Sequence, residues 1–497
     1  MKRIKLLLRT SIFTVFLLLI SAACESILDE PVYSELDTEA LLQTKTGVET
    51  VLFEGYSKVA NMNSVASQHT NKREEMTTDI LTHSDGGENQ NAVLLLDFTW
   101  DAQSLDEAAT YWLPFWQAIR NANIVLENVD RVTGVSEVYK NGIKAEARFI
   151  RAYAYYELWD QFGSIPLRTS SEDPLEIPNI PEGEVLDFVI SEFNDIEDQL
   201  PNPGEEQTYG RAHSGAVRAF LTKAYLNSKR WQEAADKAQE IISNGYYMLH
   251  PDYNALFALE NERNQEFIWV RPATSNLPDA RNTMTATALP WGFKTALDGG
   301  ISGVTNTSWT NYASQYRLRD IFFNSFGEND KRKERILTKY INGAGDTIDL
   351  IEDFDNATRS IKFPPDPAAT GLNHGNDLPK LRYADILMSR AEALNELNGP
   401  NQESIDLIND IRERAELEDI DLVSFPTKES LRDHIINERS WEFWYEAKRR
   451  RDLIRTGKFI EYALNRGVTN AKAYHVWFPI PQYAIDANSL LQQNEGY

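Results

Sequence analysis

The sequence predicts a mainly α-helical protein built from pairs of helices and interrupted by a long irregular region that contains short strands. Three observations predict this fold class. Residues 144–162 place apolar side chains three and four positions apart, which is the spacing of one helix face. Two separated segments, 215–243 and 383–415, share an order of helix, polar turn and helix. The stretch between them, 251–379, is rich in Gly, Pro, Asn, Asp and Thr.

Residues 1–23 are expected to be an export signal. The chain starts with a short basic stretch, and residues 11–23 (SIFTVFLLLISAA) are apolar or small throughout. This arrangement is typical of a secretory signal peptide, whereas a membrane-spanning helix needs about 20 apolar residues. Arg9 interrupts any longer apolar run. A retained anchor helix is the alternative interpretation.

Cys24 follows the signal directly and is the single cysteine of the chain. One thiol forms neither an intramolecular disulfide nor a metal site of four cysteines. The sequence Ser21-Ala22-Ala23-Cys24 resembles the lipobox of bacterial lipoproteins, although a Leu usually stands where Ser21 is. The resemblance implies that Cys24 is the lipid attachment site and carries a pair of acyl chains, because stable anchoring needs more than one chain. A free cysteine beside an ordinary cleavage site is the alternative.

The first long helices are expected at residues 107–129 and 144–162. In the second helix the apolar face is made by Ala145, Phe149, Ala152, Tyr156 and Trp159. Gly163 and then Pro166 end this helix. The following acidic and Pro-rich stretch, 171–183, is expected to be a surface loop, and another helix follows to about residue 199.

The segments 215–243 and 383–415 both carry alanines at close spacing on their first helix. Small residues let two helices approach closely, and paired helices with a period near 34 residues are the tetratricopeptide arrangement. Because the two copies are far apart and irregular, the sequence predicts a tetratricopeptide-like partial solenoid rather than a regular array.

Near the C-terminus, Glu438, Glu442 and Glu446 recur every four residues and Arg449, Arg450 and Arg451 follow. On one continuous helix these residues would form an acidic stripe that leads to a basic C-terminal end, which the helix dipole favours. We expect the acids to serve packing and ion pairing rather than catalysis.

The charge and motifs exclude several classes of function. The net charge of −25 becomes −29 when the four basic residues of the signal are removed. Nucleic-acid binding requires a basic face, so nucleic acid is not an expected partner. The sequence contains no H-E-x-x-H, G-x-S-x-G, P-loop or G-x-G-x-x-G motif, so no catalytic residue and no cofactor are expected. Asp79, Asp85 and Glu88 could suggest calcium, but their spacing does not fit an EF-hand loop and a solvated turn is expected instead.

The order of motifs along the mature chain resembles the SusD/RagB family. The motifs are 28–31 (LDEP), 145–153 (AEARFIRAY), 162–167 (FGSIPL), 381–393 (LRYADILMSRAEA), 438–443 (ERSWEF), 449–455 (RRRDLIR), 478–481 (FPIP) and 493–497 (QNEGY). The tail departs from the family at Ala487-Asn488-Ser489, which lacks the usual Asn-Pro, and at Glu495, which replaces a Pro. Each motif is weak alone, and their order is the specific signal.

This resemblance implies a surface-exposed lipoprotein of the outer membrane, facing the extracellular side, that binds glycan and delivers it to a SusC-like TonB-dependent transporter. It also implies a signal at residues 1–23, an N-terminal part at 24–250 with helical pairs, and a C-terminal part at 251–497 with the irregular ligand-facing region and the final helices. A transporter partner that binds peptide is one alternative, and a surface glycan hydrolase is another.

Glycan binding requires aromatic rings that stack on the C–H faces of sugars. Aromatic residues in irregular context are the candidates for this contact: Trp100, Trp291, Trp309 and Tyr312. Trp159, Trp231 and Trp269 lie in regular patterns and are expected in the core. For each candidate, packing in the core is the competing interpretation.

Overall fold

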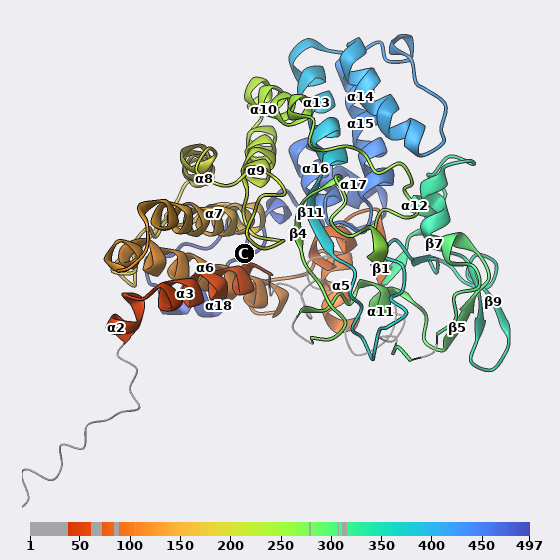
Figure 1. The fold of residues 1–497 in the computed structure, drawn as a ribbon. Coiled ribbons are helices and arrows are strands. Elements are labelled where there is room, and N and C mark those ends of the chain that lie inside the picture. The colour runs from red at the N-terminus through yellow and green to blue at the C-terminus, as the bar shows by residue number, and fades with distance from the viewer. Residues whose placement is uncertain are drawn as a thin grey trace, which may run out of the picture.

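The computed structural model of the protein describes residues 38–60, 72–83, 89–104, 106–277, 280–306, 308–310 and 316–497 (Figure 1). The expected signal at 1–23, the lipid attachment site Cys24 and the candidate Tyr312 lie outside these residues. Across the described ranges, no helix is both long enough and apolar enough to span a membrane.

A continuous series of packed helices makes the scaffold. The contacts run from α3 (Lys45–Ala60) to α6 (Asp106–Asn128), α7 (Glu137–Phe162), α8 (Glu182–Ile196), α9 (Ser214–Asn227) and α10 (Trp231–Asn244). From α10 the series continues to α13 (Tyr383–Asn398), which also packs on α14 (Gln402–Arg414) and α15 (Lys428–Phe443). The two predicted helix pairs are therefore α9–α10 and α13–α14, and they pack directly on one another through α10 and α13. The mainly helical, tetratricopeptide-like prediction is confirmed.

Shorter helices complete this scaffold. The α-helices are α2 (Thr38–Leu42), α5 (Asn89–Asp97), α11 (Met284–Ala288), α12 (Asp320–Phe323), α16 (Arg449–Arg455), α17 (Phe459–Asn465) and α18 (Gln482–Ala487). One π-helix, η1 (Lys72–Met76), and several 3₁₀ turns also occur in the described part of the chain: η2 (Val129–Arg131), η3 (Leu259–Asn261), η5 (Gly299–Ile301), η6 (Lys331–Arg335), η7 (Leu422–Ser424) and η8 (Ala473–Val476).

The end of α7 shows how the sequence sets an element boundary. Ser136 caps the start of the helix by accepting a hydrogen bond from the Tyr139 N–H. At the other end Gly163 has φ of 68°, a left-handed conformation that glycine adopts without strain. The helix ends where the sequence predicts, although it begins at Glu137 rather than near residue 144.

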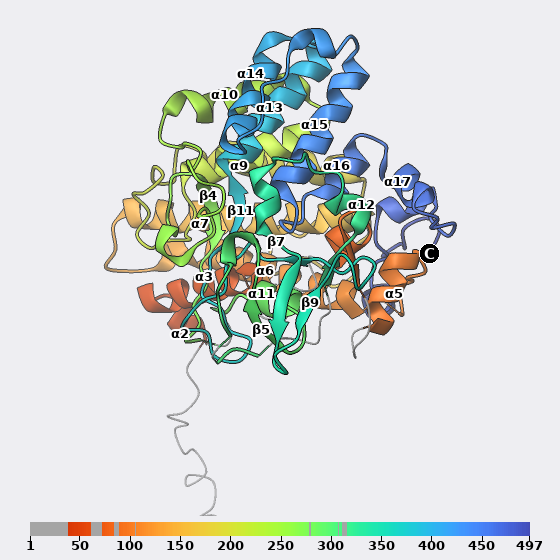
Figure 2. The same ribbon diagram turned by 90° about the vertical axis from the view of Figure 1, so that its right-hand side faces the viewer.

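Short strands form small antiparallel sheets, and most of these strands come from the irregular region, which lies on one side of the helical scaffold (Figures 1 and 2). The pairs are β1 (Leu81–His83) with β6 (Tyr316–Leu318), β2 (Ile165–Pro166) with β3 (Asn179–Ile180), β4 (Phe267–Arg271) with β11 (Leu378–Arg382), and β7 (Ile336–Leu337) with β10 (Arg359–Ser360). A three-stranded sheet has the order β5 (Phe293–Ala296), β8 (Lys339–Asn342), β9 (Thr347–Asp349). This sheet has its own apolar core, which includes Leu289, Phe293, Trp309, Tyr340 and Ile361.

The chain between α15 and α16 corrects one prediction. Helix α15 ends at Phe443 and α16 begins at Arg449, so Glu446 lies outside both helices and Arg449 to Arg451 stand at a helix start. The prediction of one helix with a basic C-terminal end was wrong.

The reason for this break is a contact with a distant residue. Tyr445 and Ala447 have φ of 64° and 59°, which a helix cannot contain. Their backbone N–H groups donate to the carboxylate of Glu75 on η1, at 3.0 and 2.8 Å. Burial raises the pKa of Glu75 to about 7, and these two donors oppose the shift.

Candidate functional site

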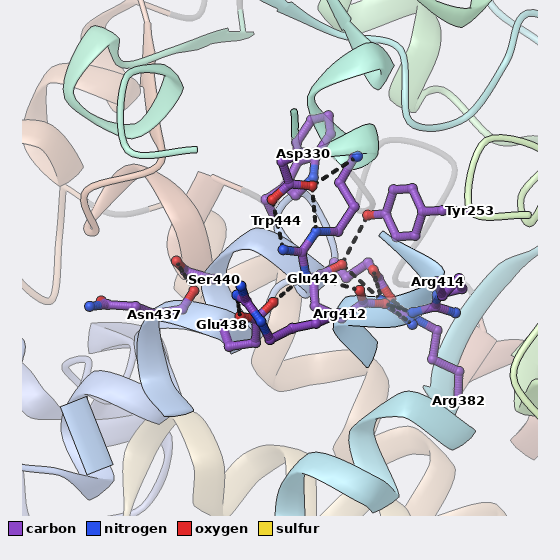
Figure 3. Close-up of polar contacts among 12 residues, drawn as sticks. Tyr253, Asp330, Arg382, Arg412, Arg414, Asn437, Glu438, Ser440, Glu442 and Trp444 are labelled. Carbon is purple, nitrogen blue, oxygen red and sulfur yellow. Dashed lines mark hydrogen bonds and ion pairs between the residues drawn. The ribbon is translucent and has the colours of Figure 1, made fainter. Parts of the chain in front are cut away.

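The acids of the late helical motif at 438–443, Glu438 and Glu442, lie in a buried ion-pair cluster (Figure 3). Glu442 accepts hydrogen bonds from Arg382 at 2.6 Å and from Arg414 at 2.5 Å. Glu438 pairs with Arg412 at 3.0 Å. The cluster also contains Glu266, Arg332, Lys362 and Glu446. It joins α15 and the chain after it to β11, α14 and the irregular region.

The burial and charge pairing of the carboxylates in this cluster are typical of a structural role. Burial opposes ionisation of Glu442, but the charges of Arg414 and Arg382 outweigh it and hold the pKa of this carboxyl well below its usual range. The side chains of Glu438 and Glu442 are fully buried. Because both carboxylates are paired with arginines and closed to solvent, they do not meet a substrate, and the prediction of packing and ion pairing is confirmed.

The calcium alternative receives no support from the described residues. Asp79 forms two hydrogen bonds with Arg449, at 2.9 and 2.8 Å. Asp85 and Glu88 lie outside the described residues. In the part of the chain that the structure describes, no three His, Cys, Asp or Glu side chains group as metal ligands.

Trp291 has an exposed ring. The residue lies between Pro290 and Gly292, just before β5, and 70% of its side-chain and backbone surface is open to solvent. Gly292 has φ of 73°, and its carbonyl oxygen accepts a hydrogen bond from the Gly343 N–H at 2.8 Å. The tight turn is thereby fixed to the β8–β9 hairpin. An indole held outward on a fixed turn can stack on a flat ligand.

Trp309 and Trp100 lie in packed surroundings instead. Trp309 is 8% exposed and belongs to the core of the β5–β8–β9 sheet. Its ring packs against that of His374, with 5.5 Å between the ring centroids. Trp100 is 3% exposed, and its Nε1–H donates to the Tyr497 hydroxyl at 2.8 Å. Neither ring presents an open face, because Trp309 is packed in the small core of this sheet and Trp100 is packed in the main core. Of these three candidates, Trp291 is the one with an exposed side chain.

The three tryptophans that are expected in the core differ in how deeply they are buried. Trp159 and Trp269 are buried, as predicted. Trp231, at the start of α10, is only partly buried and packs at the edge of the main core.

Sequence reasoning missed an aromatic cavity of 510 Å³. Its walls come from α3, α7, the chain before α9, β4 and β11. The rings that line it are those of Phe53, Tyr56, Tyr153, Tyr209 and Trp269. Phe53 and Tyr56 are three residues apart on α3, and Tyr153 ends the motif at 145–153, but no pattern in the sequence relates these residues to Tyr209 and Trp269. The fold alone brings the four segments together.

Comparison with known proteins follows the two halves of the chain. A family model described as "SusD family" matches residues 245–497, and one described as "Starch-binding associating with outer membrane" matches residues 27–226. The SusD-like protein P25 of Formosa agariphila is 27% identical, with 97% of this chain and 98% of that protein covered. The starch-binding protein SusD of Bacteroides thetaiotaomicron is 25% identical, with 82% of each chain covered.

Solved structures have the same fold. A laminarin-binding SusD-like protein superposes with a TM-score of 0.77 at 23% identity, covering 91% of this chain and 100% of that one. Surface glycan-binding protein A of Bacteroides thetaiotaomicron, solved with laminarihexaose, superposes with a TM-score of 0.74 at 19% identity, covering 91% of this chain and 99% of the other.

Proposed function

Because this chain belongs to the SusD family, we propose that it is a surface-exposed lipoprotein of the outer membrane that binds glycan and delivers it to a TonB-dependent transporter of the SusC type. The observation that carries the proposal is the pair of family matches over residues 27–226 and 245–497. The names of the relatives support it, since they describe binding of starch, laminarin and glycan by those proteins.

A protein with this function is expected to be tethered to the membrane and to bind its ligand with low affinity. A lipid anchor at Cys24 raises the effective concentration of the protein near a transporter in the same membrane, so modest contacts suffice for docking. Cargo must be passed on, which favours an affinity of roughly micromolar to millimolar, built from a few stacking contacts of about 1 kcal/mol each. We assign one of these contacts to Trp291.

Binding without catalysis is part of the proposal. The acids of the late helical motif are closed in ion pairs, and the relatives are named for binding. Affinity electrophoresis through gels that contain starch, laminarin or other polysaccharides tests retention, and an assay for new reducing ends tests hydrolysis.

We expect retention by at least one polysaccharide and no release of reducing ends. Release of reducing ends would instead support the hydrolase alternative. Retention by no polysaccharide, together with binding of peptides, would favour the peptide alternative.

A further inference from the structure

The cavity lined by Phe53, Tyr56, Tyr153, Tyr209 and Trp269 has the size and shape of a ligand site, and Trp291 is not among its lining residues. Its volume of 510 Å³ lies within the range of about 300–1,000 Å³ that small-molecule sites occupy. Phe53 on α3 is 46% exposed, so the cavity reaches the surface there. Aromatic rings on several sides offer faces on which the C–H surface of a sugar can stack.

The charged side chains among the described residues that line this cavity are all basic: Arg211, Arg271 and Lys380. This is opposite to the composition of the chain, which has 75 acidic and 50 basic residues. Arg211 pairs with Glu146 at 2.5 Å, and the Lys380 Nζ lies 3.7 Å from a carboxylate oxygen of Glu157. Neither acid is among the residues that line this cavity, so the charged residues of its wall are basic.

Arg271 keeps its charge at neutral pH in spite of its burial. It is 6% exposed, and its Nη1 donates to the Arg281 carbonyl oxygen at 2.9 Å. Burial lowers the pKa of Arg271 to about 10, and the charge of Asp377 opposes this shift. A group with this pKa is a cation throughout the neutral range.

A second, smaller cavity of 290 Å³ adjoins the first and differs in charge. The two share the wall formed by Tyr209, Gly210, Trp269 and Val270. The smaller cavity is lined by one acidic and one fully basic residue, Glu206 and Arg263, together with Gln207 and Asn264. Glu206 and Arg263 offset one another, whereas the charged residues of the larger cavity are all basic, so of the two cavities the larger one favours an acidic ligand.

We propose that the larger cavity is a second carbohydrate-binding site that takes a sugar unit bearing a carboxylate or sulfate group. The sugar ring stacks on the aromatic wall near Phe53, and the acidic group accepts hydrogen bonds from the basic side chains, Lys380 foremost. Charge-assisted hydrogen bonds to carboxylate or sulfate are stronger than those to a neutral hydroxyl. The inference rests on the proposed function, because it names an acidic class of glycan as a ligand.

Calorimetric titration of the purified protein with matched ligands tests the inference. The probes are hexagalacturonate, the same hexamer with its carboxyls reduced to alcohols, a sulfated carrageenan oligosaccharide, and its desulfated form. We expect at least one acidic probe to bind about tenfold more tightly than its neutral counterpart. The pair of probes that shows this preference identifies the acidic group as a carboxylate or a sulfate. Equal affinity within both pairs, or no binding of either acidic probe, would overturn the inference.

Variants separate the stacking and charge contributions. Phe53→Ala should weaken binding of the acidic probe about fivefold, and Lys380→Gln should remove most of the preference for acid, whereas Lys380→Arg should keep it. If Phe53→Ala fails to fold, Phe53→Leu replaces it. This variant keeps an apolar side chain but removes the aromatic ring, so it should also weaken binding of the acidic probe. The matched control is Tyr483→Ala, an aromatic residue on α18 that is 44% exposed and does not line the cavity.

The outcomes also separate this inference from the proposed function. The parent could bind a neutral glycan with an affinity that falls in Trp291→Ala but not in Phe53→Ala, and bind neither acidic probe. This result would support the proposed function and reject the second site. Parent-like binding of the acidic probe by folded Phe53→Ala and Lys380→Gln proteins would reject it as well.

Discussion

At the scale of single residues, the paired charges under the irregular region hold the parts of this protein together. Arg382 contacts Glu266 at 2.7 Å, Glu442 at 2.6 Å and Glu446 at 2.8 Å, and none of these side chains is more than 2% exposed. Breaking a buried pair by removing one partner leaves charges that neither water nor protein satisfies. The stability of the junction between β11, α15 and the following chain therefore depends on a complete set of partners.

We predict that Arg382→Met lowers the free energy of unfolding by about 3–5 kcal/mol, because it leaves buried carboxylates uncompensated. Urea denaturation followed by circular dichroism measures the change. The control is Arg230→Met, which removes an exposed pair with Glu233 at 3.0 Å and should cost less than about 1 kcal/mol. Similar losses for both variants would contradict this account of the cluster.

A second group of buried ion pairs predicts how stability depends on pH. Burial opposes ionisation of Asp452, but the charges of Arg439 and Arg455 outweigh it and lower the pKa of this carboxyl from 3.8 to about 2. Since the pKa is lower in the folded protein than in the unfolded chain, the ionised carboxyl stabilises the fold above pH 4. This stabilisation is lost as the pH falls from about 4 toward 2, and amounts to about 2 kcal/mol.

We expect the free energy of unfolding to fall as the pH is lowered from 5 to 2.5, and to fall less steeply in Asp452→Asn. Denaturant titrations at several pH values measure the two slopes. The difference between the slopes isolates Asp452 from the other carboxyls that titrate in the same range. Parallel slopes would show that this carboxyl has an ordinary pKa in the folded protein.

At the scale of elements, local sequence predicted boundaries well where the cause of the boundary is local. Gly163 ends α7 as its conformation requires, and the alanine-rich segments became the α9–α10 and α13–α14 pairs. The break between α15 and α16 could not be predicted, because it depends on Glu75, about 370 residues away in the chain.

The candidate site was predictable only in part, for related reasons. The turn of Trp291 between Pro290 and Gly292 is a local signal, and the ring is exposed. The irregular composition around Trp309 gave the same signal, but a separate core beneath the β5–β8–β9 sheet buries that ring. The aromatic cavity is assembled from distant segments, so no local pattern could indicate it.

The end of α7 provides a prediction at this scale. A Cβ atom at residue 163 would lie 2.9 Å from the Trp477 ring, in addition to the strain of φ at 68°. We expect Gly163→Ala to lower the free energy of unfolding by about 2 kcal/mol or more. Gly142, earlier on the same helix, has open space at its Cβ position, so Gly142→Ala should raise stability by about 0.5–1 kcal/mol. Thermal and urea denaturation measure both changes, and destabilisation of equal size in both variants would contradict the assignment.

At the scale of the whole molecule, a packed helical scaffold carries a loop-rich side (Figures 1 and 2). The exposed candidate, Trp291, lies in that part of the chain, just before β5. The proposed function adds a tether at Cys24, which lies outside the described residues. The tether and the contact are separate in the sequence, so each can be changed while the other is kept.

We predict that Cys24→Ala abolishes acyl labelling and releases the protein from the outer-membrane fraction, because the thiol is the proposed point of lipid attachment. Metabolic labelling with fatty acid and fractionation of cells measure both effects. Ser21→Leu restores the more usual residue before the cleavage site and should keep lipidation. In intact cells the parent should be open to added protease. Unchanged labelling and retention in Cys24→Ala would reject the anchor.

The central claim is that this member of the SusD family binds glycan through an exposed aromatic contact on its irregular side. The most direct test is calorimetric titration of the polysaccharide that the parent retains in affinity gels, with the parent, Trp291→Ala and the control Tyr483→Ala compared at equal thermal stability. We predict about fivefold weaker binding by Trp291→Ala, from the loss of roughly 1 kcal/mol of stacking, and parent-like binding by Tyr483→Ala. Parent-like affinity in Trp291→Ala would place the contact elsewhere, and the absence of glycan binding by the parent would contradict the claim itself.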